Sequence, residues 1–292
     1  MGNVAVLQDH HAKYPKSPPF DPPEEYPEFS STSLNPSNTI YPMVRTLFHQ
    51  YGLDRENYGT AEWNPFRDFC IKGGSTIIKP NLVKHFHPDG DSAMLSQIVH
   101  GSVIRPVIDY VLKAQGPDGR ITIGDTPLQK ADFGRMMELT GIAEMVNILS
   151  QRYNYTIELM DFRTEKLIVD DVSGRIRDHI ELPGDTRGYL DVDIGDVSEL
   201  SELEKNTRQN YYTLGDHSVN HLSPWTRDVG MPTNMHHPGK HCYAIGRSVL
   251  DTDTFISISK MKTHKKSGVT LSLKNLIGIV RGKEYIPHHR PG

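Results

Sequence analysis

Short β-branched segments alternate with helical stretches between residues 75 and 159, and this alternation limits the folds open to the chain. A strand–helix–strand order favours a parallel sheet because a parallel connection must cross one face of the sheet. The sequence therefore predicts an α/β fold built on an open, mainly parallel sheet with helices on both faces. The expected strands are 76–78, 121–123 and 156–159, and the expected helices are 100–115, 133–137 and 142–149.

The remaining segments indicate how the chain is organised around this sheet. Residues 1–70 contain many prolines, which fix φ and remove N–H donors, so we expect an irregular arm with short helices. This arm either wraps the domain or meets a protein partner. Residues 71–292 form the α/β domain, with an inserted or edge β/loop region at about 160–241. Strands at 243–245 and 255–258 are expected to return to the sheet.

Composition excludes several classes of protein. The only two cysteines, Cys70 and Cys242, cannot supply the four thiolates of a usual iron–sulfur cluster, and we expect a reducing, cytoplasmic setting. No apolar run is long enough to span a membrane. Phosphate-loop, dinucleotide-binding and nucleophile-elbow motifs are missing from the sequence. The acidic balance, with a net charge of −4, argues against nucleic acid as a partner.

Residues 260–290 are basic although the whole chain is acidic. They hold six lysines and two arginines against one acid, Glu284. Such a concentration of positive charge after an expected strand is typical of an anion site, and a solvated lysine face is the plainer alternative. Lys274 and Asn275 lie within an apolar run, where a merely solubilising charge would be unfavourable, so we favour the anion site.

Three expected strands end in polar clusters, at 79–81, 124–126 and 260–264. In open parallel sheets, ligands bind beyond the carboxyl ends of the strands, so these clusters are expected to meet in one cleft. His264 and Asp125 are the catalytic candidates, because imidazole titrates near neutrality and a carboxylate can accept a proton. A structural ion pair between Asp125 and Lys260 is the alternative. The ligand-binding candidates are Lys79, Asn81, Lys260, Lys262, Lys274 and Asn275.

The chain also has 15 histidines, which raises the question of a divalent metal. The candidate ligands His236, His237 and His241 lie close together in the sequence. Loop histidines are more often solvated or bonded to the backbone, so the metal stays an open alternative with no identity assigned.

The motifs IIKPNLV, RITIGDTP and ISISKMKTHKKSGVTLSLKNLIGIVRGKEYIPHHRPG resemble the family called domain of unknown function 362. The resemblance covers about residues 75–292 and is most specific over 255–291. Some members of that family carry a ferredoxin-like iron–sulfur module; this chain lacks the cysteines of that module, so the role is not carried over. Members with the Pro-His-His-Arg ending resemble a group linked to surface-polysaccharide synthesis and extend beyond this point, so a further C-terminal piece is expected. The order His264, Gly268, Lys274 is similar to that of nickel-pincer racemase-like proteins, although Val269 and Thr270 replace their glycine pair.

Three hypotheses follow for the function. The first is an enzyme acting on a small anionic metabolite or sugar that carries a phosphate or carboxylate group. The second is a non-catalytic anion- or metal-binding module of a larger assembly. The third is a scaffold in which the motif only packs, and it predicts that Lys274 is buried against a carboxylate.

Overall fold

The structure is a computed structural model that describes residues 4–30, 33–170, 176–205, 213–214, 235–264, 267–282 and 285–289. Within these ranges, no helix is both long enough and apolar enough to cross a membrane.

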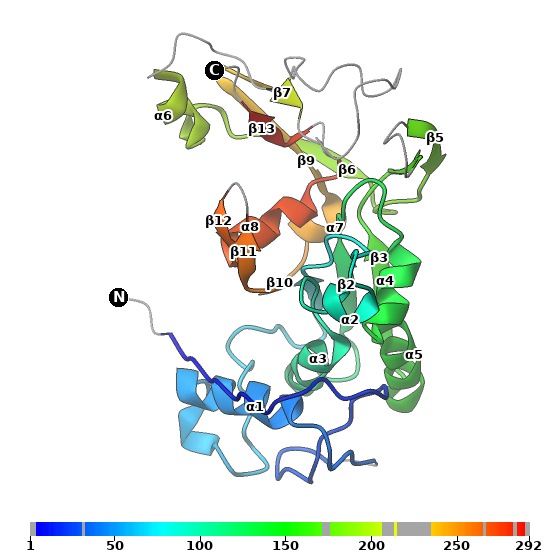
Figure 1. The fold of residues 1–292 in the computed structure, drawn as a ribbon. Helices are drawn as coiled ribbons and strands as arrows, with labels where there is room; N and C mark the ends of the chain where they lie inside the picture. Colours follow the sequence, from blue (N-terminus) through cyan, green and yellow to red (C-terminus); the bar gives the residue numbers. More distant parts are fainter. Residues whose placement is uncertain are drawn as a thin grey trace.

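A four-stranded parallel sheet forms the centre of the α/β domain (Figure 1). Its strand order is β10–β1–β2–β3, so the last strand in sequence adds to the edge beside the first. The β1 strand is buried at all six positions, as expected for a strand covered on both faces. The strands are β1 (Ser75–Pro80), β2 (Arg120–Asp125), β3 (Thr156–Asp161) and β10 (Thr254–Ile258).

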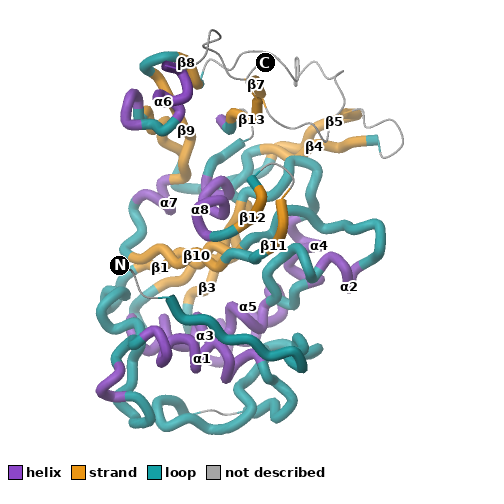
Figure 2. Tube along the Cα trace, turned by 60° about the vertical axis from the view of Figure 1, so that its left-hand side comes forward, coloured by secondary structure: helices purple, strands orange, loops and turns teal. Residues whose placement is uncertain are grey.

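Helices flank this sheet and contribute most of the core. The α3 helix contacts α1 and α5, and Figure 2 shows these three helices together on one side of the strands. Apolar residues of α3 and α5 join β1 and β2 in one buried cluster. The predicted α/β fold with a parallel sheet and flanking helices is confirmed. The helices are α1 (Ile40–Tyr51), α3 (Gly101–Gln115), α4 (Phe133–Leu139) and α5 (Ile142–Tyr153).

One strand expectation is wrong. The segment around 243–245 does not join the parallel sheet but forms β9 (Lys240–Gly246), which pairs antiparallel with β6 (Tyr189–Asp193) and β8 (His236–His237). The sequence of a short strand does not indicate which strand it will pair with, and here β6 is the partner of β9. The β4 (Glu165–Val169) and β5 (Ile176–Glu181) strands form an antiparallel hairpin in the same part of the chain.

The remaining elements are short. They are η1 (Arg55–Asn57), α2 (Asp91–Met94), η2 (Gly195–Val197), α6 (Leu200–Lys205), β7 (Thr213–Leu214), α7 (Arg247–Leu250), β11 (Lys262–His264), β12 (Gly268–Thr270), α8 (Ser272–Asn275), η3 (Leu276–Ile279) and β13 (Pro287–His289).

The proline-rich arm lies against the domain. Phe20 is almost fully buried in the main core cluster, next to residues of α3 and α5. Asp21 accepts hydrogen bonds from Arg105 and Arg152, and Glu28 pairs with Arg45 at 2.7 Å. Buried contacts of this kind tie an irregular segment down, because removing one partner would leave an uncompensated charge.

Candidate functional site

Lys79 and Asp125 form an ion pair where β1 and β2 end. The amino nitrogen of Lys79 lies 2.6 Å from Oδ1 of Asp125, and the two residues are only 1% and 2% exposed. The backbone N–H of Leu82 donates to the other carboxylate oxygen at 2.8 Å. Burial lowers the pKa of Lys79, and the adjacent Asp125 carboxylate opposes that shift. Lys79, and not the alternative Lys260, is therefore the ion-pair partner of Asp125.

Asn275, from the distant α8 segment of the sequence, hydrogen-bonds to the Lys79 member of this pair. The amino group of Lys79 donates to Oδ1 of Asn275 at 2.7 Å and to the carbonyl oxygen of Pro80 at 3.0 Å. The amide nitrogen of Asn275 donates in turn to the Lys79 carbonyl oxygen and to the hydroxyl of Ser257. The Lys79 ammonium therefore has two neutral hydrogen-bond acceptors in addition to the carboxylate of its ion pair.

The α8–η3 turn approaches the ion pair through a glycine. A Cβ atom at Gly278 would collide with Oδ1 of Asp125 and with the amino group of Lys79. The carbonyl oxygen of Gly278 accepts a hydrogen bond from the backbone N–H of Thr126 at 2.8 Å. The Leu-Ile-Gly step of the basic segment thus sits directly on the ends of β1 and β2, where only a hydrogen side chain fits.

A second group of polar contacts lies beside the first. Lys262 begins β11, and its amino group donates to Oδ1 of Asn81 at 2.8 Å and to the backbone carbonyl oxygen of Gln97. Asn81 directly follows β1, and its backbone N–H donates to Ile258 at the end of β10. The predicted residues Asn81 and Lys262 are therefore brought to the same end of the sheet as Asp125.

Three lysines, Lys260, Lys262 and Lys274, lie close together here and form what we call the lysine group. Among the described residues, none of their amino groups pairs with a carboxylate. Lys274, on α8, has neither a hydrogen bond nor an ion pair in the described part of the chain, which differs from the carboxylate contact that a mere scaffold would need. Burial and then Lys79 lower its pKa. Burial, followed by Lys274, lowers the pKa of Lys262 to about 8. Lys260 completes the set, and Figure 2 places α8, β11 and β12 beside the sheet.

Lys260 is held by the N-terminal arm. Its amino group donates to the hydroxyl of Tyr14 at 2.6 Å, and the Tyr14 ring stacks on His100 with centroids 4.5 Å apart. His100 caps α3 by accepting from the backbone N–H of Ser102 at 3.2 Å. Burial and then Lys260 lower the pKa of His100 to about 4, so this imidazole is neutral near pH 7. The arm thus reaches the lysine group.

His264 lies two residues after Lys262 on β11, so the two side chains share one face of that strand. Its Nδ1 accepts a hydrogen bond from the backbone N–H of Ser267 at 3.1 Å. The described contacts of His264 do not include Asp125, whose carboxylate is engaged by Lys79 and Leu82. Proton transfer by this pair stays a prediction, and the buried contacts of Asp125 favour a supporting role for its carboxylate.

The histidine candidates for a metal lie in a different region, on the β8–β9 hairpin. His236 and His241 are fully buried with their Nδ1 atoms 3.4 Å apart, and Nε2 of His236 donates to the carbonyl oxygen of Tyr285 at 2.7 Å. His237 is exposed and contacts the Pro238 carbonyl oxygen. Among the described residues, no group of three or more histidine, cysteine or acidic side chains is arranged to hold a metal ion.

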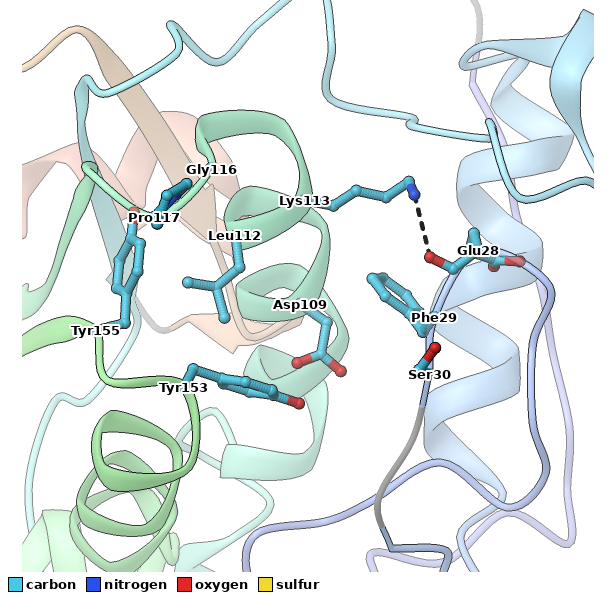
Figure 3. A pocket seen from close by; sticks show the side chains of 10 residues that line it. All are labelled: Glu28, Phe29, Ser30, Asp109, Leu112, Lys113, Gly116, Pro117, Tyr153 and Tyr155. Atoms are coloured by element: carbon cyan, nitrogen blue, oxygen red, sulfur yellow. Dashed lines mark hydrogen bonds between the residues drawn. The ribbon is translucent and has the colours of Figure 1, made fainter.

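A cavity of about 380 Å³ lies at the opposite end of the sheet, between the arm and α3 (Figure 3). The figure shows Lys113 donating to the backbone carbonyl oxygen of Glu28 across its rim. Asp109, on its wall, accepts from Tyr41 and Arg105. These polar groups already have partners, so the cavity lacks the unpaired charges found around Lys274.

Several residues of the site could not be predicted from the sequence. Tyr14 and His100 lie far from the basic segment in sequence, and a tyrosine in a proline-rich arm carries no local sign of its partner. Gln97 contributes only a backbone oxygen, which no side-chain pattern can predict. Gly278 was visible as part of the Leu-Ile-Gly step, although its steric role depends on Lys79 and Asp125.

Comparison with known protein families gives a match to this chain. The family described as Domain of unknown function (DUF362) matches residues 76–194 and 206–292, which include Lys79, Asp125 and the whole basic segment. No curated protein and no solved structure gives a significant match. Because the two matched ranges cover more than half of the chain, this protein belongs to the DUF362 family.

Proposed function

We propose that this chain binds a small anionic metabolite or sugar, phosphorylated or carboxylated, at the lysine group beyond the ends of β1 and β10, and acts on it as an enzyme. The observation that carries the proposal is the amino group of Lys274, which is half-buried yet has no counter-charge among the described residues. An anion at this point would relieve both the burial cost and the repulsion between lysines.

The neighbouring contacts support the same assignment. Lys262 and Lys260 donate to neutral acceptors, Oδ1 of Asn81 and the Tyr14 hydroxyl, so neither amino group is paired with a carboxylate in these contacts. The buried pair of Lys79 and Asp125 is already neutralised and supports the strand ends from beneath. Lys79 and Asn275 would thus act by positioning α8, the short helix that carries Lys274.

The test uses inorganic phosphate at constant ionic strength and measures the thermal midpoint of unfolding. A ligand present at ten times its Kd stabilises the folded state by about 1.4 kcal/mol. The wild-type midpoint should rise with phosphate, and Lys274→Met and Lys262→Met should remove most of the rise. Lys72→Met is the control, because Lys72 is an exposed lysine just before the opposite end of β1. Equal rises in all four proteins would overturn the proposal.

The enzymatic part needs a separate measurement. Incubation with a panel of sugar phosphates and small carboxylic acids, followed by mass spectrometry, should reveal a product that is lost in Lys274→Met and in His264→Ala. Phosphate-dependent stabilisation without any product would instead favour the second candidate, a non-catalytic anion-binding module. The links to surface-polysaccharide synthesis and to a pincer-type cofactor remain expectations from resemblance.

A further inference from the structure

The amino group of Lys262 is surrounded in a way that suits a neutral amine. It donates to two acceptors, Oδ1 of Asn81 and the backbone carbonyl oxygen of Gln97, and neither is charged. An ammonium group has three N–H donors, whereas a neutral amine has two and a lone pair. Two acceptors therefore satisfy the neutral form fully and leave its lone pair available for reaction.

The charges around Lys262 favour the same form. Lys274 faces it from α8, Lys260 from the segment before β11, and Lys84 from the loop after β1. Asp125 is the nearby acid, and its carboxylate is already paired with Lys79. Burial together with these neighbouring cations lowers the pKa of Lys262 to about 8, so an appreciable fraction is unprotonated near neutral pH. Desolvation and adjacent cations are the two features that turn a lysine into a nucleophile.

We propose that Lys262 forms a covalent imine with the carbonyl carbon of a small anionic aldehyde or ketone whose anionic group is held by Lys274 and Lys260. This inference rests on the anion site proposed above and names its substrate class more narrowly. A sugar phosphate in its open-chain form and a 2-oxo acid both combine an anion with a carbonyl group.

The chemistry requires no redox partner. The nitrogen lone pair attacks the carbonyl carbon, the carbon–oxygen π bond breaks, and the oxygen takes up a proton while the nitrogen loses one. The resulting carbinolamine then takes a further proton on its hydroxyl group and releases water, which leaves a protonated carbon–nitrogen double bond. Arginine at this position would keep the positive charge but could not follow this course, because its guanidinium does not lose its proton.

Pyridoxal 5′-phosphate is a suitable probe because it carries a phosphate and an aldehyde. The protein is incubated with the probe, reduced with borohydride, which supplies hydride to any imine, and digested for peptide mass analysis. Lys262 should be modified at least tenfold more than the exposed Lys72. Pyridoxal, which lacks the phosphate, should label Lys262 much less, and free phosphate should compete with the probe.

One variant and a pH series separate the outcomes. Lys262→Arg should lose the adduct, and the rate of labelling in wild-type protein should reach half its limit near pH 8. Labelling of Lys262 at no more than the level of Lys72 would overturn the imine. If phosphate still stabilised the protein in that case, the anion site would stand alone, whereas a failure of both measurements would remove both proposals.

Discussion

The amino nitrogen of Lys79 lies 2.6 Å from a carboxylate oxygen of Asp125, and the two charges are shut off from solvent at the carboxyl ends of adjacent parallel strands. This pair joins β1 to β2 and lies beneath the η3 turn that follows Lys274. A buried pair of this kind is costly to form, yet removing one partner costs more than the pair contributes. It therefore fixes how α8, which carries Lys274, and the following η3 turn lie on the sheet.

Removing one member of the pair should destabilise the protein strongly. Lys79→Met is expected to lower the free energy of unfolding by about 3–5 kcal/mol, because it leaves the Asp125 carboxylate buried without a counter-charge. The double variant Lys79→Met/Asp125→Asn should lose less than the sum of the two single losses, since it removes both charges together. Urea unfolding of the four proteins measures this coupling, and simple additivity would contradict it.

Gly278 should tolerate no side chain. Gly278→Ala places a methyl group against Asp125 and Lys79, and we expect a loss of about 1–3 kcal/mol through overpacking. Gly134→Ala is the matched control, because Gly134 is exposed within α4 and alanine favours helix there by about 1 kcal/mol. Urea unfolding should move the two variants in opposite directions. A neutral Gly278→Ala would show that the turn does not press on the ion pair.

His100 should make stability depend on pH in the acid range. The unfolded chain takes up a proton near the ordinary value of 6.5, whereas the folded imidazole, buried under Tyr14 and near Lys260, does so only at about 4. Between these values the unfolded state holds more protons, so the free energy of unfolding rises with pH across this window.

The variant His100→Asn keeps a side-chain acceptor for the start of α3 and removes the titrating group. The stability difference between wild-type and variant protein should shift by on the order of 2 kcal/mol between pH 4.5 and pH 7. Chemical unfolding at these two pH values checks the shift. A constant difference would mean that His100 titrates alike in both states.

Tyr14 should tie the arm to the lysine group. Tyr14→Phe keeps the ring stacked on His100 but removes the hydroxyl that accepts from Lys260, at a cost of about 0.5–1.5 kcal/mol. Because the amino group of Lys260 is then released, phosphate should stabilise this variant at least as much as it stabilises wild-type protein. Tyr51→Phe, at an exposed position of α1, is the control. A smaller phosphate effect in Tyr14→Phe than in the control would indicate that the hydroxyl itself binds the anion.

The pattern of strands and helices was predictable because it depends on local sequence. Alternating β-branched runs and helical faces predicted the parallel sheet from β1 to β3, and the polar residues after those strands pointed to one edge. The β9 strand shows where local pattern fails, since its partner β6 is about 50 residues away and the two strands share no local signal.

The sequence by itself determined the α/β class, the basic segment and the candidate residues at the strand ends, because strand and helix periodicity and charge are properties of neighbouring residues. Only the tertiary structure decided which charges cancel. It paired Asp125 with Lys79, left Lys274 without a carboxylate among the described residues, and brought Tyr14 to Lys260 across 246 positions of sequence. Electrostatic pairing depends on distance and burial in three dimensions, and neither is written in the order of the residues.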